Sequence, residues 1–177
     1  MGSDLCISPL GAEFNRHTFD CTIPELNDFL RKRARKHEKQ GMSVTYVLHR
    51  DNELDILGFY AISMAEIKTN DMQNDLVKEL PHHPVPAVRI GRLAVAKAQQ
   101  EKGYGSALLW DAIERSISLS DEIGARAIEA HAKNDQARAF YLRHGFISLV
   151  DDKNHLYLSM DTARKVLEYL EKAAESV

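Results

Sequence analysis

The stretch from Arg89 to Leu109, RIGRLAVAKAQQEKGYGSALL, constrains the fold more than any other part of the chain. It begins as an apolar strand, turns at two glycines and continues as a helix. The first N–H groups of a helix have no intrahelical acceptor, and with the helix dipole they form an anion site. Because glycine lets the main chain approach a phosphate closely, the stretch predicts a strand, a phosphate-binding corner and a helix.

Two common phosphate-binding motifs do not fit this corner. A P-loop needs Gly-Lys followed by Ser or Thr, whereas Gly105 precedes Ser106 and Ala107. A dinucleotide fingerprint needs a third small residue at a position that Leu108 occupies. The remaining spacing is Q-x-x-G-x-G, from Gln100 to Gly105. Taken alone, this spacing also fits a tight strand-to-helix turn that binds no ligand.

A mixed α/β order of elements surrounds the corner. Pro24 and Glu25 suit the first turn of a helix that Thr22 would cap and that would stop at Gly41. Periodicity and turn residues predict the other elements in the same way. The expected helices cover residues 22–39, 71–80, 103–119, 135–144 and 162–176, and the expected strands cover residues 43–50, 54–65, 85–95, 126–132, 146–150 and 155–160.

A second motif follows the strand at 126–132. It reads N-x-x-A-x-x-F-Y-x-x-x-G-F from Asn134 to Phe146. Together with the glycine corner, this motif resembles the GNAT superfamily of acetyl-CoA-dependent N-acetyltransferases, over about residues 19–158. The resemblance implies an α/β GNAT fold: a central mixed, mostly antiparallel sheet with two splayed parallel strands, flanked by helices. Residues 1–177 would form one domain, with a C-terminal helical extension from about residue 162.

The resemblance also implies acetyl-CoA as the cosubstrate. Backbone amides of the corner would bind its pyrophosphate, and the free edge of the strand ending in RLAV would pair with the pantetheine. Asn134 and Tyr141 would lie near the thioester. The residues expected to contact acetyl-CoA are Leu93, Ala94, Val95, Gln100, Glu101, Lys102, Gly103, Tyr104, Gly105, Ser106, Asn134, Ala137 and Tyr141. Glu101 stands where glycine is common in the family.

Acetyl transfer to an amine needs a neutral amine, a donor to the carbonyl oxygen and an acid for the leaving thiolate. The resemblance assigns the acid to Tyr141, and a backbone N–H near Ala94 or Val95 would serve as the oxyanion donor. The neighbouring Phe140 fits a core position better than Tyr141 does. No general base stands out, and no metal site is expected. Glu66, Glu129, His131, His82 and His83 are more typical of structural or solvated groups.

The missing base matters for the choice of amine. A lysine amine with a pKa of about 10.4 is neutral only about 0.1% of the time at pH 7.5, and deprotonating it costs about 4 kcal/mol. An α-amine with a pKa of about 7.8 is neutral about a third of the time, so its deprotonation costs under about 1 kcal/mol. A site without a base therefore favours α-amines.

Several segments resemble a narrower branch, the toxin acetyltransferases of bacterial toxin–antitoxin pairs, which acetylate the α-amine of aminoacyl-tRNA. The resembling segments are residues 19–21, 26–30, 58–63, 84–86 and 91–95. A glycine usually follows the cysteine of the first segment, where this chain has Thr22. The resemblance implies an antitoxin protein as a partner.

A basic face on the first helix could engage tRNA phosphates. At helical spacing its side chains lie within an arc of about 140°. The residues expected to contact the acceptor substrate are Arg31, Lys32, Arg35, Lys36, Arg89 and Arg92. A solvated surface helix, an enzyme of a small-molecule or peptide amine, and a CoA-binding module without turnover are the alternatives.

Charge and composition narrow the remaining possibilities. The net charge of −3 argues against a globally basic nucleic-acid binder, although a local basic face remains compatible with it. No apolar run approaches the length of a membrane span, and no secretory signal is evident. The two cysteines, Cys6 and Cys21, form no metal pattern and fit a reduced compartment. We expect a cytoplasmic homodimer that does not bind membranes.

Overall fold

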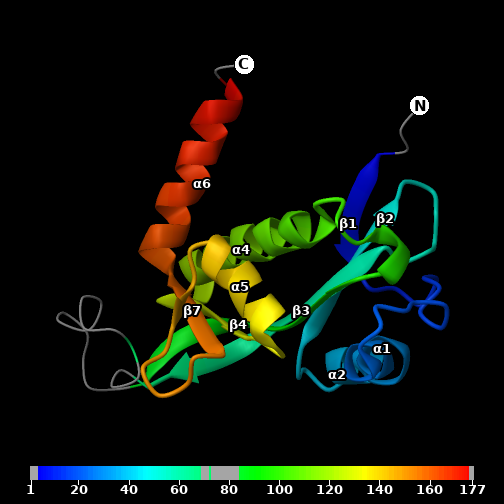
Figure 1. Cartoon of the computed structure of the whole chain (residues 1–177), viewed down its shortest axis with the longest axis horizontal. Coiled ribbons are helices and arrows are strands. Elements are labelled where there is room, and N and C mark those ends of the chain that lie inside the picture. Colours follow the sequence, from blue (N-terminus) through cyan, green and yellow to red (C-terminus); the bar gives the residue numbers. More distant parts are fainter. Residues whose placement is uncertain (1–3, 69–71, 73–83, 176–177) are drawn as a thin grey trace. The chain divides into compact units, whose positions relative to one another are not determined.

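The computed structural model describes residues 4–68, 72 and 84–175 of the chain (Figure 1). The helix expected over 71–80 and the histidines His82 and His83 lie outside the described residues. The chain divides into two compact units. The first comprises Met1–Ser63 and Ile90–Ala112, and the second comprises Met64–Arg89 and Ile113–Val177.

The first unit holds the N-terminal elements and the glycine corner. Its complete elements are β1 (Leu5–Pro9), α1 (Pro24–Asp28), the π-helical turn η1 (Phe29–Arg33), α2 (Ala34–Lys39), β2 (Val44–Arg50) and the short 3-10 helix η3 (Lys97–Gln99). Three longer elements begin in one unit and end in the other: β3 (Gly58–Ile67), β4 (Val85–Val95) and α4 (Tyr104–Ile123).

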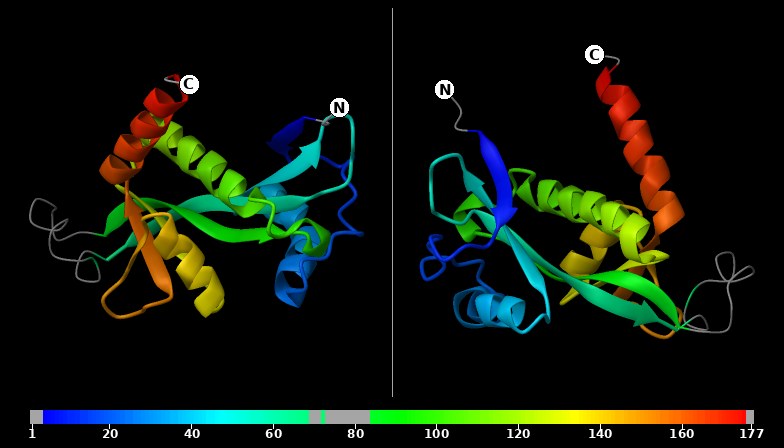
Figure 2. Two further views of the ribbon diagram at one scale, coloured as in Figure 1. Left: turned by 45° about the horizontal axis from the view of Figure 1, so that its top comes forward. Right: turned by 180° about the vertical axis from the view of Figure 1, so that it is seen from behind.

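The second unit holds the C-terminal elements. They are β5 (Ala127–His131), α5 (Asp135–Arg143), β6 (Ile147–Ser148), β7 (His155–Ser159) and α6 (Met160–Glu175). Figure 2 shows α6 leaving the end of β7 and extending away from it. Only the first turns of α6 are packed, because Met160 and Ala163 are buried whereas Tyr169 is 72% exposed. Among the described residues, no helix combines the length and the apolar run that crossing a bilayer requires.

The strands form a seven-stranded mixed sheet in the order β1-β2-β3-β4-β5-β7-β6. It is mostly antiparallel with one parallel pair, which confirms the expected sheet. Strand β1 pairs antiparallel with β2, with Leu5 opposite Arg50. Sequence reasoning did not predict β1, since LCISP is short and ends at a proline, as edge strands often do.

Strand β3 begins at Gly58 rather than at the expected Leu54. A Cβ on Gly58 would lie 2.8 Å from Leu108 Cδ1 and 2.9 Å from Ala94 O, so only glycine fits this approach. Immediately before it, the Leu57 carbonyl accepts from the Ala96 N–H at 2.8 Å. These contacts join the start of β3 to the end of β4 and to α4, which fixes the strand that leads into the glycine corner.

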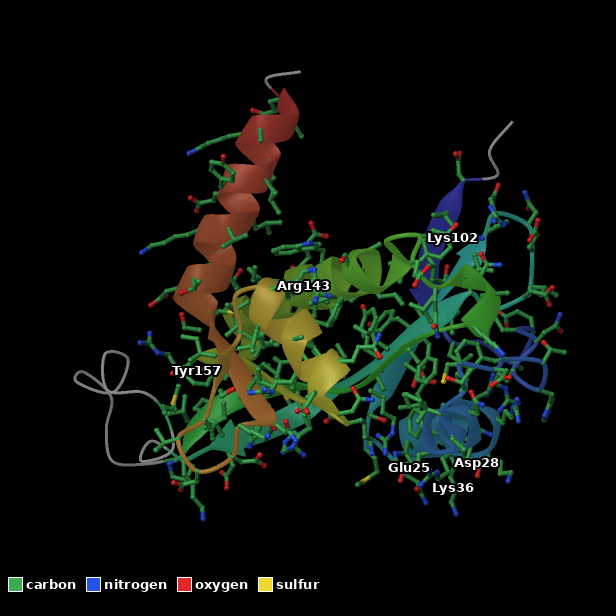
Figure 3. All side chains as sticks on the ribbon, viewed as in Figure 1. Glu25, Asp28, Lys36, Lys102, Arg143 and Tyr157 are labelled. Carbon is green, nitrogen blue, oxygen red and sulfur yellow. The ribbon has the colours of Figure 1, made fainter. Side chains whose placement is uncertain are left out.

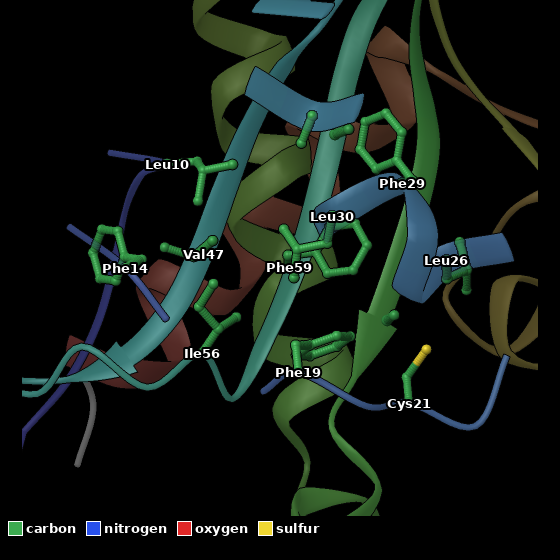
Figure 4. Packing of buried hydrophobic residues seen from close by; sticks show 13 residues of the cluster. Leu10, Phe14, Phe19, Cys21, Leu26, Phe29, Leu30, Val47, Ile56 and Phe59 are labelled. Carbon is green, nitrogen blue, oxygen red and sulfur yellow. The ribbon is translucent and has the colours of Figure 1, made fainter. Parts of the chain in front are cut away.

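An aromatic core holds the first unit together. Figure 4 shows Phe19, Phe29, Leu30 and Phe59 packed between the helical segment and the strands, and each is at most 2% exposed. The Phe19 and Phe59 rings meet edge-on at 5.4 Å. Burying a side chain of this size contributes about 1.5–3 kcal/mol. This core therefore anchors the segment from residue 24 to residue 39 on the strands.

A separate core holds the second unit. It comprises Ile67, Met72, Val85, Ala87, Ala127, Leu149 and Tyr157, with Ala65 packed against it. Tyr157 lies on β7 and is fully buried. The register of β5 on β7 places Glu129 opposite Tyr157 and His131 opposite His155. The second unit thus carries two histidines side by side at one end of its strand pair.

Candidate active site

The glycine corner, residues 95–106, lies entirely in the first unit. Strand β4 ends at Val95, the 3-10 turn follows, and α4 begins at Tyr104. The Gln100 side chain donates from Nε2 to the Val95 carbonyl at 3.2 Å, which closes the loop on the strand end. The order of strand, loop and helix is the one that the sequence predicts.

The start of α4 supplies main-chain donors. Ala107 donates to the Gly103 carbonyl at 3.1 Å, so the amides of Tyr104 and Gly105 precede the first helical hydrogen bond and have no acceptor within the helix. No acidic residue lies in the first turn of α4. Gly103 has a φ of +80°, and Lys102 next to it adds a positive charge. These features fit a diphosphate such as that of coenzyme A.

Two departures from the family pattern lie in left-handed backbone. Glu101, where glycine is common, has a φ of +64°, and Thr22, where glycine usually follows the cysteine, has a φ of +72°. Non-glycine residues adopt this region at a cost, above all when they are β-branched. The glycine preference at both positions therefore has a conformational cause.

Replacing Glu101 by glycine is expected to raise the free energy of unfolding by up to about 1.5 kcal/mol. The left-handed conformation costs an L-residue about 1–2 kcal/mol, and the extra freedom of glycine in the unfolded chain takes back about 0.5–1 kcal/mol. Urea unfolding measures the difference. Glu101→Gln is the control, since it removes the charge and keeps Cβ. Equal stability of the two variants would contradict the conformational explanation.

The expected capping box at the start of the first helix is wrong. The N-cap residue is Ile23, which makes no side-chain cap hydrogen bond. The Asp20 carboxylate instead accepts from the Thr22 N–H and from Asn27 Nδ2, both at 2.8 Å. The hydrogen bond from Thr22 and that from Asn27 lower the pKa of Asp20. The left-handed Thr22 turns its N–H toward Asp20, so the acidic residue organises this turn.

The Asp20 turn is joined to the glycine corner. The Lys97 N–H donates to the Asp20 carbonyl at 2.8 Å. A hollow of about 510 Å³ lies on the turn, lined by Asp20, Thr22, Pro24, Asn27, Asp28 and Arg31. Cys21, between Asp20 and Thr22 in the chain, is buried, and burial raises the pKa of its thiol and keeps it protonated.

The expected basic face does not form as one continuous helical arc. Residues 29–33 form a π-helical turn between α1 and α2, so the regular helical spacing does not hold across the segment. Arg31 turns inward and donates to the Phe19 carbonyl, and Lys32 pairs with Asp28 at 3.1 Å. Lys36 is exposed, and Figure 3 shows Asp28 and Lys36 pointing away from the strands.

Arg92 on β4 is held by an aromatic ring. Its guanidinium carbon lies 3.9 Å from the centroid of the Phe29 ring, a cation–π contact within the first unit. Burial lowers the pKa of Arg92, followed by the effect of Arg33, yet an arginine keeps its charge at neutral pH. Phe29, which holds Arg92, belongs to the same π-helical turn that interrupts the regular helical spacing of the basic residues.

Helix α5 of the second unit carries the second motif. Asn134 is its N-cap, and its side-chain oxygen accepts from the Ala137 N–H at 2.8 Å. Tyr141 is 5% exposed and its ring lies 5.3 Å from that of Phe146. The expectation that Phe140 takes the more buried position is wrong. Phe140 is half-buried and contacts His144, whereas Tyr141 is buried and contacts Phe146.

Burial strongly raises the pKa of Tyr141, which keeps its hydroxyl protonated at neutral pH. Across the residues that the structure describes, the Tyr141 hydroxyl makes no hydrogen bond. The proton therefore stays on the oxygen and is not committed to a neighbouring protein group. A protonated hydroxyl is one requirement of a general acid, whereas the raised pKa opposes release of that proton.

Arg89 is engaged within the second unit. Its Nε donates to the Glu129 carboxylate, which is fully buried, and His155 Nε2 lies 2.6 Å from the other carboxylate oxygen. Both carboxylate oxygens of Glu129 thus have a partner. Glu66 is exposed on β3. Sequence reasoning missed the pairing of Glu129 with His155, because the two residues lie on strands separated by α5.

Comparison with known families decides the class of protein. The pattern of the Acetyltransferase (GNAT) family matches residues 12–146, which include the glycine corner and the motif on α5. The chain belongs to the GNAT acetyltransferase family. The predictions of this family, of its fold and of an acetyl-CoA-dependent acetyltransferase are therefore confirmed.

Individual relatives come from the toxin branch. A tRNA-acetylating toxin of Mycobacterium tuberculosis is 40% identical over 85% of this GNAT chain and 89% of its own. A complex of AtaT with acetyl-methionyl-tRNAfMet has a TM-score of 0.87 at 27% identity, covering 93% of this chain and 99% of AtaT. A second AtaT structure contains acetyl-CoA and the C-terminus of the antitoxin AtaR. It superposes on this chain with a TM-score of 0.80 at 27% identity, and the match covers 93% of this chain and 98% of AtaT.

Proposed function

We propose that this GNAT enzyme transfers an acetyl group from acetyl-CoA to the α-amine of aminoacyl-tRNA, as the toxin of a toxin–antitoxin pair. The observation that carries the proposal is the 40% identity, over nearly the full length of both chains, to a tRNA-acetylating toxin. The similarity to AtaT in complex with acetyl-methionyl-tRNAfMet supports the same acceptor.

Acetyl-CoA, when bound, supplies an acetyl thioester. The amides at the start of α4, with Gly103, Tyr104, Gly105 and Ser106, bind the diphosphate, and Lys102 adds a positive charge. Residues 93–95 of β4 pair with the pantetheine. Of the expected contacts, Asn134 and Ala137 act by fixing the start of α5, since the Asn134 side chain caps that helix.

Tyr141 donates a proton to the leaving thiolate. Its protonated hydroxyl on α5 supports this role. The chain needs no strong base for an α-amine, because such an amine is already neutral in about a third of molecules near neutral pH. A backbone N–H at Ala94 or Val95 is the proposed donor to the carbonyl oxygen.

The tRNA contacts come from the segment between residues 31 and 39. Lys32 and Lys36 are exposed and Arg35 is half-exposed, so all three can reach phosphates. Arg31 and Arg92 were expected to contact the tRNA, but each is held by another residue of the first unit. Arg31 donates to the Phe19 carbonyl, and Arg92 lies over the Phe29 ring. We assign both a positioning role.

The remaining features of the proposal concern the cell and the assembly. The enzyme is a cytoplasmic homodimer whose residues 1–177 form one functional GNAT domain with a C-terminal helix. An antitoxin binds and silences it, as the complexes of AtaT with AtaR suggest.

Removing the charges of Lys32 and Lys36 together is expected to flatten the salt dependence of tRNA binding. For every phosphate that is no longer neutralised by a lysine, the slope of log K against log salt falls by about 0.7–0.9. The measurement is the Kd of charged tRNA for wild type and for Lys32→Gln/Lys36→Gln between low and physiological salt.

The matched control removes two charges elsewhere. Lys165→Gln/Lys172→Gln, on the exposed part of α6, is expected to keep the wild-type slope. Equal slopes for both double variants would refute the assigned contact surface. A wild-type enzyme that binds no tRNA would refute the tRNA substrate and favour a small-molecule or peptide amine.

A further inference from the structure

Three ligand-type side chains meet on one face of the β5–β7 pair in the second unit. Glu129 and His131 alternate on β5, so they point to the same side of the strand. His155 begins β7 and lies directly opposite His131 in the antiparallel register. Two imidazoles and a carboxylate thus come from strands whose sequences are far apart, and the proposed acetyl transfer uses none of them.

The distances within this cluster are short. His155 Nε2 lies 2.6 Å from Glu129 Oε2, and the two imidazole rings stack with their centroids 3.9 Å apart. One nitrogen from each histidine and one oxygen of Glu129 all lie within 4.8 Å of one another. A tetrahedral Zn²⁺ with ligands at about 2.0–2.1 Å holds them about 3.3 Å apart. The observed spacings bracket that value. Because the lone pairs of the two stacked rings run nearly parallel, one histidine has to turn out of the stack for both nitrogens to reach one ion.

The carboxylate of Glu129 is prepared for this role. It is fully buried, and Arg89 donates to one oxygen while the other faces His155. Ligating carboxylates are usually held in this way by a hydrogen-bond donor outside the metal site. Arg89 also neutralises the charge of Glu129. The site therefore has no net negative charge that would attract a divalent cation. The attraction therefore has to come from the coordinate bonds of two imidazoles.

One histidine offers a free approach. His131 is exposed at the end of β5. An ion can reach the cluster from solvent beside His131, and water can occupy its fourth position.

We propose that Glu129, His131 and His155 form a binding site for a divalent transition metal, with Zn²⁺ as the fitting ion. Two nitrogen ligands and one carboxylate are a set that zinc and its neighbours accept, whereas Mg²⁺ and Ca²⁺ prefer oxygen ligands alone. The sequence analysis expected no metal site. His131 and His155 lie 24 positions apart, so no spacing motif joins them.

The test titrates the full chain, without a histidine tag, with Co²⁺ and Zn²⁺ alone. We expect about one ion per chain, visible absorption bands of four-coordinate Co²⁺, and displacement of Co²⁺ by Zn²⁺. His131→Ala and His155→Ala are each expected to weaken binding at least tenfold. His17→Ala, which removes an exposed histidine of the first unit, is expected to change nothing.

Arg89→Gln gives a second readout that keeps all three ligands. Removing the guanidinium leaves the charge of Glu129 without its neutralising partner, so we expect metal binding to tighten, opposite in sign to the effect of the histidine variants. Absence of saturable binding by wild type, or equal affinity of wild type and His131→Ala, would overturn the proposal. His131→Ala is decisive, because this exposed side chain is not needed for packing. The assay measures metal alone, so it does not depend on the proposed acetyl transfer.

Discussion

Tyr141→Phe is expected to lower kcat by about 10²–10⁴-fold, the range that a general acid typically contributes. The variant removes one oxygen atom and keeps the ring that packs against Phe146. The hydroxyl makes no hydrogen bond within the described part of the chain, so folding is expected to survive the change. The affinity for acetyl-CoA is expected to remain that of wild type, which places the loss in the chemical step.

A second buried tyrosine provides the control for Tyr141. Tyr157 lies in the same unit on β7 and is fully buried. Tyr157→Phe removes the same atom type, and we expect it to keep kcat within a few fold of wild type. Wild-type turnover by Tyr141→Phe would remove the acid role. A similar fall in both variants would indicate a general packing effect.

Gly105→Asp is expected to abolish acetyl-CoA binding at concentrations that saturate wild type. The substitution places a carboxylate in the first turn of α4, where the proposed diphosphate lies against the amides. At about 4 Å and an effective dielectric constant near 20, two unit charges repel by about 4 kcal/mol, which lowers affinity about 10³-fold. Isothermal titration with acetyl-CoA measures the loss.

The same substitution is not expected to unfold the helix. An acidic residue in the first turn of a helix is favourable because of the helix dipole, and α4 has none there in wild type. Gly105→Asn is the matched control, because it has the size of aspartate without the charge. We expect it to bind acetyl-CoA more tightly than Gly105→Asp does. Wild-type affinity in Gly105→Asp would refute the phosphate assignment.

The parts of the fold that depend on local signals could be predicted. Strand β4 occupies the expected residues 85–95, and α5 starts at the expected Asp135. Glycines with positive φ end α2 and α5 near the expected positions, at Gly41 and Gly145. In each case the residue type itself restricts the backbone, so one stretch of sequence carries the information.

The features that sequence reasoning missed depend on distant partners. The π-helical turn at Phe29–Arg33 shows no local signal, and its phenylalanine packs on Phe59 and under Arg92. Glu25 suggested a capping box, yet Asp20 outcompetes it because Thr22 adopts a left-handed conformation. Tertiary contacts decided both cases. The sequence shows that Thr22 and Glu101 stand where the family often has glycine. Only the backbone angles show that both residues adopt a left-handed conformation.

In the candidate site, local signals located the glycine corner, whereas distant contacts decided what the basic side chains do. The corner is local, so its loop, helix start and open amides follow from one stretch of sequence. The expected basic residues were chosen by type and by helical spacing, which says nothing about what each side chain contacts. Arg89 is consequently paired with Glu129, and Arg31 is turned toward Phe19.

The most direct test follows the acetyl group itself. Purified enzyme is incubated with isotopically labelled acetyl-CoA and a mixture of aminoacyl-tRNAs, and the aminoacyl ends are released and identified by mass spectrometry. We predict label on the α-amine of the amino acid, formed by wild type and lost in Tyr141→Phe. Unlabelled aminoacyl-tRNA, from an enzyme that acetylates small amines or peptides in parallel reactions, would contradict the proposed function.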